Sequence, residues 1–412
     1  MVKRAICLAG GGPAVGLSIG ALKRLEQEPD IQFDVVSTAC IGAWLAVTYY
    51  QAPAGKGLES TLGFFDRVFQ PERTYSRFPV ATVFAPNFPK MMENTVSFVM
   101  DPGNYRNLVV PEKIMEATED LMGFATSPSR WTVADFNQTL LNSVFAANPV
   151  SRFLTSMIYL SQTKGLAQVF YPNSRLLNDI NFDALYEPDK PFIYHNAYNL
   201  TRQELQLFCN KPAESGLPKI TARSLCACSA LPYIEDTVDI DGDTYCEGAT
   251  VDTVNFEGLL KNHPDLEEVW VSRILDRKQV RKPENLYDAL NNLVMLFAAT
   301  TSEDDVKIFR ERIKEHGRHV DVVEIPVAHN INYDWTYENL HRSIRDGYDA
   351  TALTIEKYRE GQALDTSPVH VRRDDTHHWL DVVRKRRTIT PINRARRART
   401  GAKPSAATDA AE

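Results

Sequence analysis

The sequence has no uninterrupted apolar run approaching the eighteen or so residues that cross a bilayer as a helix. It has only six cysteines, at positions 7, 40, 209, 226, 228 and 246, and their spacing is not that of a disulfide framework. Met1–Arg4 is basic, but three consecutive glycines interrupt the apolar segment that a secretory signal needs. We therefore expect a protein of a reducing compartment, the cytoplasm.

Nucleotide and metal motifs are also missing. Gly10 and Gly12 are followed by Val15 where a dinucleotide-binding fingerprint has its third glycine, and no Gly-Lys-Ser/Thr of a Walker loop is present. The spacing of Cys226 and Cys228 does not match the usual Cys-x₂₋₄-Cys of a zinc site, and the nine histidines show no ligand spacing. A structural zinc is the alternative only if several cysteines converge in the fold. We expect no metal and no organic cofactor.

The composition is that of an ordinary globular protein, because 43% of residues are hydrophobic and 24% are charged. A chain of 412 residues can bury one large α/β core with insertions, or form two domains. The net charge of −7 conceals a basic tail, since Arg384 to Lys403 contains nine Lys and Arg residues and no acid. Such a tail suits a peripheral contact with an anionic membrane, and a solvated flexible end is the alternative. Nucleic-acid binding would depend on this tail alone and is not expected.

The strongest single signal is a break between a strand-like and a helix-like segment. Residues 31–46 begin β-branched, reach small residues around Cys40, and continue apolar at helical spacing. A side chain at a strand-to-helix turn is lifted out of the sheet and faces the positive end of the helix dipole. Gly42 would let the helix pack close to the strand. We expect Cys40 to be a nucleophile, with a buried structural cysteine as the alternative.

A glycine loop near the N-terminus is the second signal. Residues 5–9 form a short apolar strand that runs directly into Gly10, Gly11 and Gly12, and a helix is expected over about 14–28. Consecutive glycines allow successive backbone N–H groups to point at one spot. Such donors could hold an oxyanion near the Cys40 sulfur or cradle a phosphate.

A polar turn, Tyr245-Cys246-Glu247-Gly248-Ala249, places one carboxylate beside small residues, and Ser229-Ala230-Leu231-Pro232 precedes it. With the glycine loop and the strand-to-helix turn, these segments resemble the patatin-like acyl hydrolases over roughly residues 1–360. In that family a glycine-rich oxyanion loop follows the first strand and a Gly-x-Ser-x-Gly elbow follows the second. A distant Asp-Gly-Gly or Asp-Gly-Ala carries the catalytic carboxylate. The resemblance implies that Glu247 is the base and that the amides of the glycine loop form the oxyanion hole.

The chain departs from the family pattern at both catalytic positions. Cys40 stands in place of the serine, Thr38 in place of the first glycine of the elbow, and Glu247 in place of the aspartate. Ala14 and Val15 occupy positions where the family has a basic residue and a glycine. Both catalytic positions keep a chemically competent group. We therefore interpret the chain as a thiol variant of the family.

The chemistry of a Cys40–Glu247 pair can be anticipated. A thiol has a pKa of about 8.5, which a helix N-terminus lowers and a nearby carboxylate raises. Proton transfer from Cys to Glu is uphill by about four pKa units, or roughly 5.5 kcal/mol, and we expect burial of Glu247 to shrink this gap. The product would be an acyl-thioester, which amines and thiols attack more readily than an oxygen ester. Acyl transfer is therefore the alternative to ester hydrolysis.

Two further alternatives remain open. Glu247 could be a surface turn residue in an acidic stretch, in which case Asp252 is the alternative base; otherwise Asp252 and Gly248 support the turn. The whole chain could also be a catalytically silent patatin-like protein that binds lipid or a partner, with the basic tail as its contact.

Strands alternating with helices predict a three-layer α/β/α domain with a central mixed, mainly parallel sheet over residues 1–362. Residues 363–412 are predicted to form the basic tail. Within the domain, 55–180 is apolar and proline-interrupted, which predicts a helical insertion. In a lipolytic enzyme it would line or cover an acyl-chain cleft, and a helical subdomain packed on itself is the alternative. The other expected elements are strands at 191–199, 204–209, 268–275 and 319–327 and helices at 220–230, 283–300 and 336–359.

Overall fold

The computed structural model describes residues 2–69, 88–106, 108–160, 164–167, 174–327, 332–363 and 390–391. Contacts between residues divide the chain into two compact units. The first unit comprises Met1–Phe84, Val169–Pro232 and Thr237–Glu412, and the second comprises Ala85–Gln168 and Tyr233–Asp236. The basic tail lies outside the described residues, except that Gln362–Ala363 (β11) pairs antiparallel with Thr390–Pro391 (β12).

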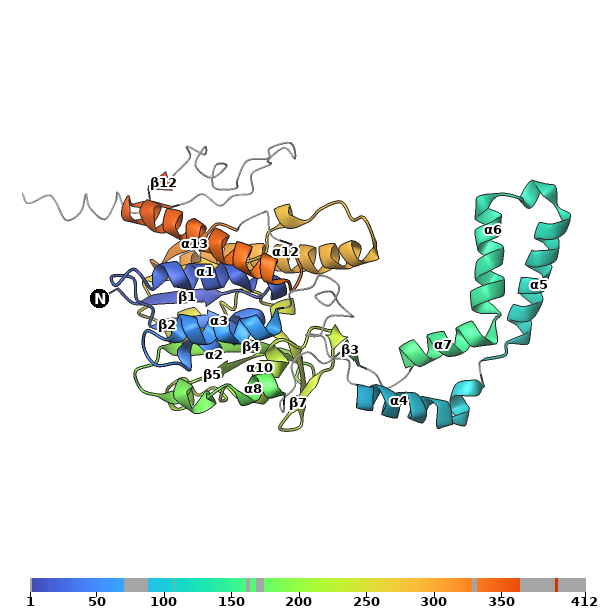
Figure 1. The fold of residues 1–412 in the computed structure, drawn as a ribbon, viewed down its shortest axis with the longest axis horizontal. Coiled ribbons are helices and arrows are strands. Elements are labelled where there is room, and N and C mark those ends of the chain that lie inside the picture. The colour runs from blue at the N-terminus through green and yellow to red at the C-terminus, as the bar shows by residue number, and fades with distance from the viewer. Residues whose placement is uncertain are drawn as a thin grey trace, which may run out of the picture. The chain divides into compact units, whose positions relative to one another are not determined.

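The first unit is built on an eight-stranded mixed sheet in the order β10-β9-β1-β2-β4-β8-β7, with β5 also paired to β4 (Figure 1). The neighbours from β10 to β4 are all parallel, whereas β5, β8 and β7 pair antiparallel. The strands are Arg4–Leu8 (β1), Val35–Thr38 (β2), Phe192–Asn199 (β4), Glu204–Cys209 (β5), Val238–Ile240 (β7), Asp243–Glu247 (β8), Glu268–Ser272 (β9) and Asp321–Ile325 (β10). The prediction of a mixed, mainly parallel sheet is confirmed.

Helices cover both faces of this sheet. The helices of the first unit are Gly16–Leu25 (α1), Ile41–Tyr50 (α2), Gly57–Val68 (α3), Arg175–Asn178 (α8), Pro212–Ser215 (α9), Ala222–Cys228 (α10), Leu259–Asn262 (α11), Leu286–Glu315 (α12) and Tyr337–Arg359 (α13). Ile6 and Leu8 of β1 join one hydrophobic core with α1, α2 and α13. Ala5 and Cys7 point to the opposite face and join a second core with α11 and α12. The sheet therefore separates two cores, as a three-layer α/β/α fold requires.

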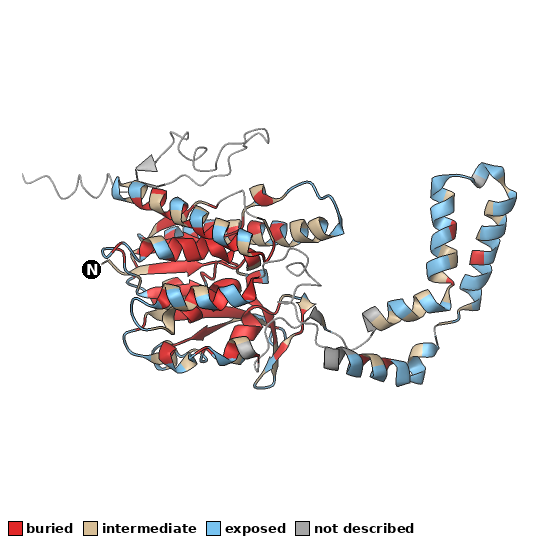
Figure 2. Ribbon diagram, in the orientation of Figure 1, coloured by how far each residue is buried: buried red, intermediate tan, exposed pale blue. Residues whose placement is uncertain are grey.

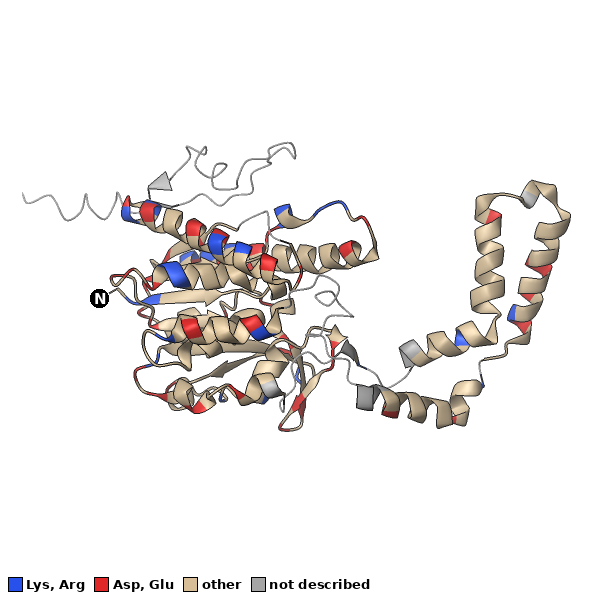
Figure 3. Ribbon diagram, in the orientation of Figure 1, with Lys and Arg blue, Asp and Glu red and all other residues tan. Residues whose placement is uncertain are grey.

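The second unit is helical. It contains Phe88–Met100 (α4), Pro111–Thr126 (α5), Val133–Leu140 (α6), a π-helix at Leu141–Ala146 and Pro149–Leu160 (α7). Gly165–Ala167 (β3) pairs with Tyr233–Glu235 (β6) in the same unit. Most of its helical surface is exposed (Figure 2), and charged side chains are sparse on α4 and α6 (Figure 3). No helix among the described residues is long and apolar enough to span a membrane.

The second unit is shorter than the predicted insertion over 55–180. Helix α3 belongs to the first unit, because Phe64 and Phe65 are buried in the core that covers one face of the sheet. Residues 70–87, 107, 161–163 and 168–173 of the predicted range lie outside the described residues. The aromatic residues of α3 and the insertion look alike in sequence, so composition alone could not separate them.

Helix α12 is longer than the predicted helix over 283–300. Thr300, Thr301 and Ser302 lie where the predicted helix ends, and residues of this kind often compete with helical hydrogen bonds. In the structure their hydroxyls donate to the helix's own carbonyls: Thr301 Oγ1 to Phe297 O at 3.0 Å and Ser302 Oγ to Ala299 O at 3.1 Å. The run therefore continues the helix to Glu315 instead of ending it.

Helices α1 and α13 pack so closely that two glycines are required at their crossing. A Cβ on Gly347 would lie 2.0 Å from Leu17 O, and one on Gly20 would lie 2.1 Å from Ile344 O. A backbone carbonyl cannot rotate away as a side chain can. We therefore expect Gly347→Ala to lower the free energy of unfolding by about 1–3 kcal/mol, the range typical of overpacking. Urea denaturation of the purified variant measures this change.

The control for this prediction is Gly63→Ala in α3, where an added Cβ meets no atom within 4 Å. Alanine has the higher helix propensity, so this variant should gain about 0.5–1 kcal/mol. If both variants changed the free energy of unfolding by the same amount, the close packing of α1 and α13 would not require glycine at position 347.

Candidate active site

The turn between β2 and α2 holds Cys40 in a strained backbone conformation. Cys40 is the N-cap residue of α2, with φ 48° and ψ −124°, backbone angles that residues other than glycine seldom adopt. A Cβ on Gly42 would lie 2.1 Å from Leu8 O, so α2 can start this close to β1 only because residue 42 is glycine. The structure thus places Cys40 on the strand-to-helix turn that the sequence indicates.

The loop after β8 fixes the strand that leads into this turn. Asn255 Nδ2 donates to Thr38 O at 2.9 Å, and Ser37 Oγ donates to Asn255 O at 2.5 Å. Asp252 orients this loop, because its carboxylate accepts the Asn255 N–H at 2.6 Å and the Glu257 N–H at 3.2 Å. The Asp252 carboxylate is therefore engaged in holding backbone, which favours a positioning role over that of a base.

Glu247 ends β8 and is only 5% exposed. Its carboxyl group lies beside the Cys40 thiol, close enough for each group to shift the pKa of the other. Burial raises the pKa of Glu247 to about 7, although its interaction with Cys40 works in the opposite direction. A Cβ on Gly248 would lie 2.6 Å from Asn196 Oδ1, so the turn after Glu247 also requires a glycine. The structure thus brings the two predicted catalytic side chains into contact, and Glu247 is not a surface residue.

Burial of Glu247 raises its pKa as expected, but the fold buries Cys40 as well. Burial raises the pKa of the Cys40 thiol well above its ordinary value, and the neighbouring Glu247 carboxylate raises it further. The Ile41 N–H at the start of α2 lowers this pKa, but its effect is outweighed. Because both pKa values rise together, the pair rests as an un-ionised thiol beside Glu247. The proton must move as the sulfur attacks.

The glycine loop lies against Cys40 and against the turn that follows Glu247. A Cβ on Gly10 would be 3.0 Å from the Cβ atoms of Cys40 and Ala249. The Gly10 N–H, however, donates to Thr253 O at 3.0 Å. The expectation that all three glycine amides serve an oxyanion is therefore corrected at Gly10, whose amide holds the loop to the Glu247 turn. The amides of Gly11 and Gly12 remain as the candidate donors.

Two further cysteines surround the pair. The Cys40 N–H donates to Cys228 Sγ at 3.1 Å, and the charge of Glu247 adds to burial in raising the pKa of Cys246 to about 11. All six cysteines are free. Some of the cysteines that a zinc site would require, Cys40, Cys228 and Cys246, thus do lie near one another. Even so, within the described ranges no three His, Cys, Asp or Glu side chains are grouped to hold an ion.

Tyr333 is a site residue that sequence reasoning missed. A Cβ on Gly12 would lie 3.1 Å from the Tyr333 hydroxyl, and the charges of Cys40 and Glu247 add to burial in raising the pKa of this phenol. Tyr333 comes from the segment before α13, far along the chain from the glycine loop. No local motif marks it, because only the tertiary fold brings it to Gly12.

A thiol on a strained strand-to-helix turn, a buried carboxyl group at the end of β8 and a glycine loop beside the thiol define an α/β/α protein of the acyl-hydrolase type. The profile of the patatin-like phospholipase family matches residues 6–260, and the chain belongs to this family. The family is generally hydrolytic and acts on lipid acyl esters. The resemblance inferred from the sequence is thus confirmed at the level of family and fold.

Other comparisons add little. Among solved structures, VipD from Legionella pneumophila matches with 14% sequence identity and a TM-score of 0.38. The match covers 86% of this chain and 67% of that one. A search of curated proteins finds no match.

Proposed function

We propose that this protein is a lipid acyl hydrolase in which Cys40 is the nucleophile and Glu247 the general base. The observation that carries the proposal is the placement of the Cys40 thiol, on its strained turn, beside the buried Glu247 carboxyl group, so that each group shifts the pKa of the other. A nucleophile with its base beside it is the arrangement that covalent catalysis needs.

In the acylation step, the Cys40 sulfur attacks the ester carbonyl carbon while Glu247 takes the thiol proton. The carbonyl π electrons move onto oxygen, and the amides of Gly11 and Gly12 stabilise the resulting oxyanion. Collapse of this intermediate breaks the C–O ester bond, and Glu247 returns the proton to the leaving alcohol. Water assisted by Glu247 then attacks the thioester, releases the fatty acid and restores the thiol. Two side chains and backbone dipoles suffice, so no cofactor enters this scheme.

The helical second unit supplies the surface for acyl chains in this proposal. Its helices expose many large apolar side chains, including Met100 at 75% and Val133 at 78%. Methionine adapts to irregular apolar shapes, which suits long alkyl groups. Composition and exposure support this role over a subdomain packed only on itself.

Turnover of defined esters tests the proposed function. Wild-type protein should release p-nitrophenol from acyl p-nitrophenyl esters and fatty acid from at least one member of a lipid panel. No release from any ester would favour the silent lipid-binding alternative. Added thiols or amines distinguish hydrolysis from acyl transfer. Faster loss of ester, with an acylated thiol or amine as the product, would indicate an acyltransferase. Acyl transfer is the second candidate because thiols and amines attack a thioester on Cys40 readily.

The basic tail is proposed as a peripheral contact with anionic membranes. Each Lys or Arg near an anionic lipid surface contributes about 1 kcal/mol, and the Debye length falls from about 10 Å at 0.1 M salt to about 3 Å at 1 M. Truncation after Glu360 should therefore weaken co-sedimentation with anionic vesicles at low salt while leaving turnover of a soluble ester nearly unchanged. Equal binding of the full-length and truncated proteins would leave the tail as a solvated end.

A further inference from the structure

Helix α12 lies against the 3₁₀ turn Gly248–Thr250 that follows Glu247. Asp305 of this helix faces the same region, because its Oδ2 atom accepts both the Thr253 N–H at 2.8 Å and the Val254 N–H at 3.2 Å. Asp305 is half-buried. Nothing in the proposed hydrolytic mechanism uses this carboxyl group.

Thr253, one of the two residues that Asp305 holds, connects the glycine loop to the turn after Glu247. Its carbonyl oxygen accepts the Gly10 N–H at 3.0 Å, and its hydroxyl donates to Ala249 O at 2.7 Å. A displacement of Thr253 would therefore move the glycine loop and the turn after Glu247 relative to each other.

The same loop also reaches the strand that leads to the nucleophile. Asn255 Nδ2 donates to Thr38 O at 2.9 Å, and Asp252 Oδ1 accepts the Asn255 N–H at 2.6 Å. Asp252 thus braces the loop from within, whereas Asp305 ties the loop to a helix outside it. The two carboxyl groups therefore have different structural tasks.

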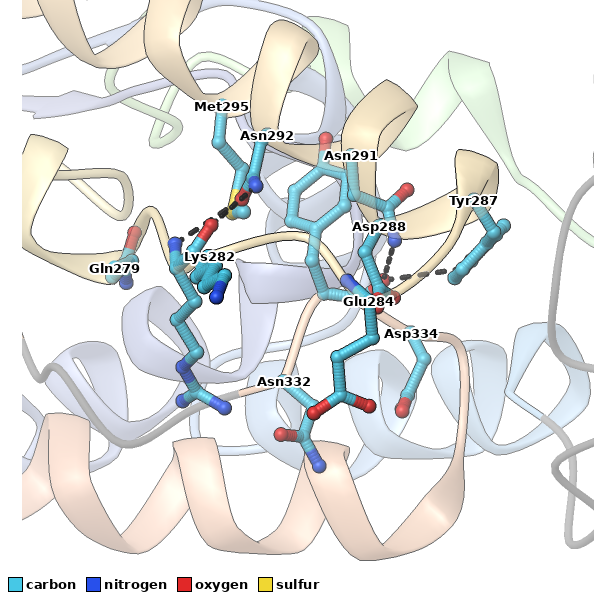
Figure 4. Close-up of a pocket in the computed structure, with 12 residues that line it drawn as sticks. Gln279, Lys282, Glu284, Tyr287, Asp288, Asn291, Asn292, Met295, Asn332 and Asp334 are labelled. Carbon is cyan, nitrogen blue, oxygen red and sulfur yellow. Dashed lines mark hydrogen bonds between the residues drawn. The ribbon is translucent and has the colours of Figure 1, made fainter.

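Helix α12 is a fixed support for this contact. Val306, which follows Asp305, is buried in the core on one face of the sheet. Near the start of the helix, Tyr287 Oη and Asn291 Nδ2 donate to Tyr333 O at 3.4 and 3.5 Å in the wall of a polar cavity (Figure 4). The helix is thus anchored at its start and beside Asp305.

The contact depends on an acceptor oxygen and not on a negative charge. Both N–H groups bond to the same atom, Oδ2 of Asp305. Burial and the neighbouring Asp252 carboxylate raise the pKa of Asp305, so the surroundings disfavour its charge. Asparagine at this position would keep a carbonyl oxygen for the same two donors, whereas alanine would remove it.

We propose that Asp305 is a positioning residue that anchors the loop of Thr253 to α12. Through this loop it keeps the glycine loop, Cys40 and Glu247 in the arrangement that ester hydrolysis requires. A displacement of about 1 Å in an active site can cost on the order of 10²-fold in rate. The inference rests on the proposed function for its meaning in catalysis, but the positioning itself can be measured on the Cys40 thiol without turnover.

Steady-state turnover of a short acyl p-nitrophenyl ester is the first test. Asp305→Ala should lower kcat on the order of 10- to 100-fold with KM nearly unchanged, because the reacting groups are displaced and the substrate surface is not. Asp305→Asn should restore most of the lost kcat, since its amide oxygen accepts the same two N–H groups. The matched control is Asp304→Ala, which removes an exposed acid that accepts from Lys307 Nζ at 3.2 Å, and its kcat should not change.

Alkylation of Cys40 by iodoacetamide, followed by mass spectrometry of the digested protein, is the second test. In the wild-type protein, burial and Glu247 hold the pKa of the Cys40 thiol well above its ordinary value. A loosened loop in Asp305→Ala should lower this pKa, so alkylation of Cys40 at pH 8 should become faster on the order of 10-fold. The buried Cys209 is the internal control, because general unfolding would expose both thiols.

The two tests separate this inference from the proposed function. Faster alkylation of Cys40 alone, in a protein that hydrolyses no ester, would keep the positioning role and overturn the proposed hydrolysis. Unchanged alkylation of Cys40 in Asp305→Ala, an unchanged kcat, or an equal loss of kcat in Asp305→Asn would overturn the positioning role. Faster alkylation of Cys209 as well would also overturn it, because Asp305 would then serve general stability.

Discussion

Cys40→Ala is expected to reduce acyl turnover by roughly 10⁴- to 10⁶-fold, which leaves only background hydrolysis, because the variant lacks the sulfur that forms the covalent intermediate. Cys40 is partly buried against the core, but alanine keeps its Cβ and removes only the sulfur, so the variant should fold normally. Initial rates on an acyl p-nitrophenyl ester measure the effect. Cys40→Ser should keep a trace at most, since a hydroxyl is a weaker acid than the thiol to which this site is fitted.

The matched control replaces a thiol that lies elsewhere. Cys209 is buried at the end of β5, where its sulfur accepts the Lys211 N–H at 3.3 Å. Cys209→Ala should therefore keep its turnover. Full activity in Cys40→Ala, with thermal unfolding like that of the wild-type protein, would end the covalent hypothesis.

Glu247→Gln is expected to slow acylation by about 10²- to 10⁴-fold, the range typical of losing a general base. Because the pKa of Glu247 is about 7, the wild-type rate should rise with pH through this value as the carboxylate forms, and then level off. The variant should lack this rise, because glutamine does not titrate. Single-turnover rates of both proteins between pH 5 and 9 would show the difference.

Stability provides the control for Glu247→Gln. The pKa of Glu247 in the folded protein, about 7, lies above its ordinary value of 4.5, so the folded state holds a proton that the unfolded chain loses earlier. The stability that this group contributes is thus fully present below about pH 4.5 and is lost as the pH rises through about 7. Glutamine has no such loss, and the variant should be at least as stable as the wild-type protein at pH 8.

Asp252→Asn distinguishes the two carboxylates. Its carboxylate holds the N–H groups of Asn255 and Glu257, so the substitution should disturb the loop more than the chemistry. If Asp252→Asn lost its acyl turnover while Glu247→Gln kept most of it, Asp252 and not Glu247 would be the base.

Local patterns predicted the elements that carry the site. The small residues around Cys40 indicated its turn, and the strand-to-helix geometry that followed places it at the start of α2. The strands Phe192–Asn199 and Glu204–Cys209, which pair antiparallel, followed from two β-rich runs. These features depend on residues close together in sequence, so sequence alone contained them.

Features that depend on distant segments escaped prediction. Gly10 was expected to face an oxyanion, but Thr253 O takes its amide proton. Burial was expected to act on Glu247 alone, but the fold encloses Cys40 as well and raises both pKa values. Tyr333 lies against Gly12 only because the chain between β10 and α13 returns to the glycine loop that follows β1. Burial and long-range contacts arise only when the core has assembled, so no local sequence pattern marks them.

Rapid-quench mass spectrometry tests the central claim most directly. Wild-type protein is mixed with a slowly hydrolysed acyl p-nitrophenyl ester, quenched in acid within the first turnover, and measured intact and after digestion. The account predicts one added acyl mass, located on the peptide that contains Cys40 and removed by neutral hydroxylamine, as expected for a thioester. An adduct on any other residue, or turnover with no adduct at any time, would contradict it.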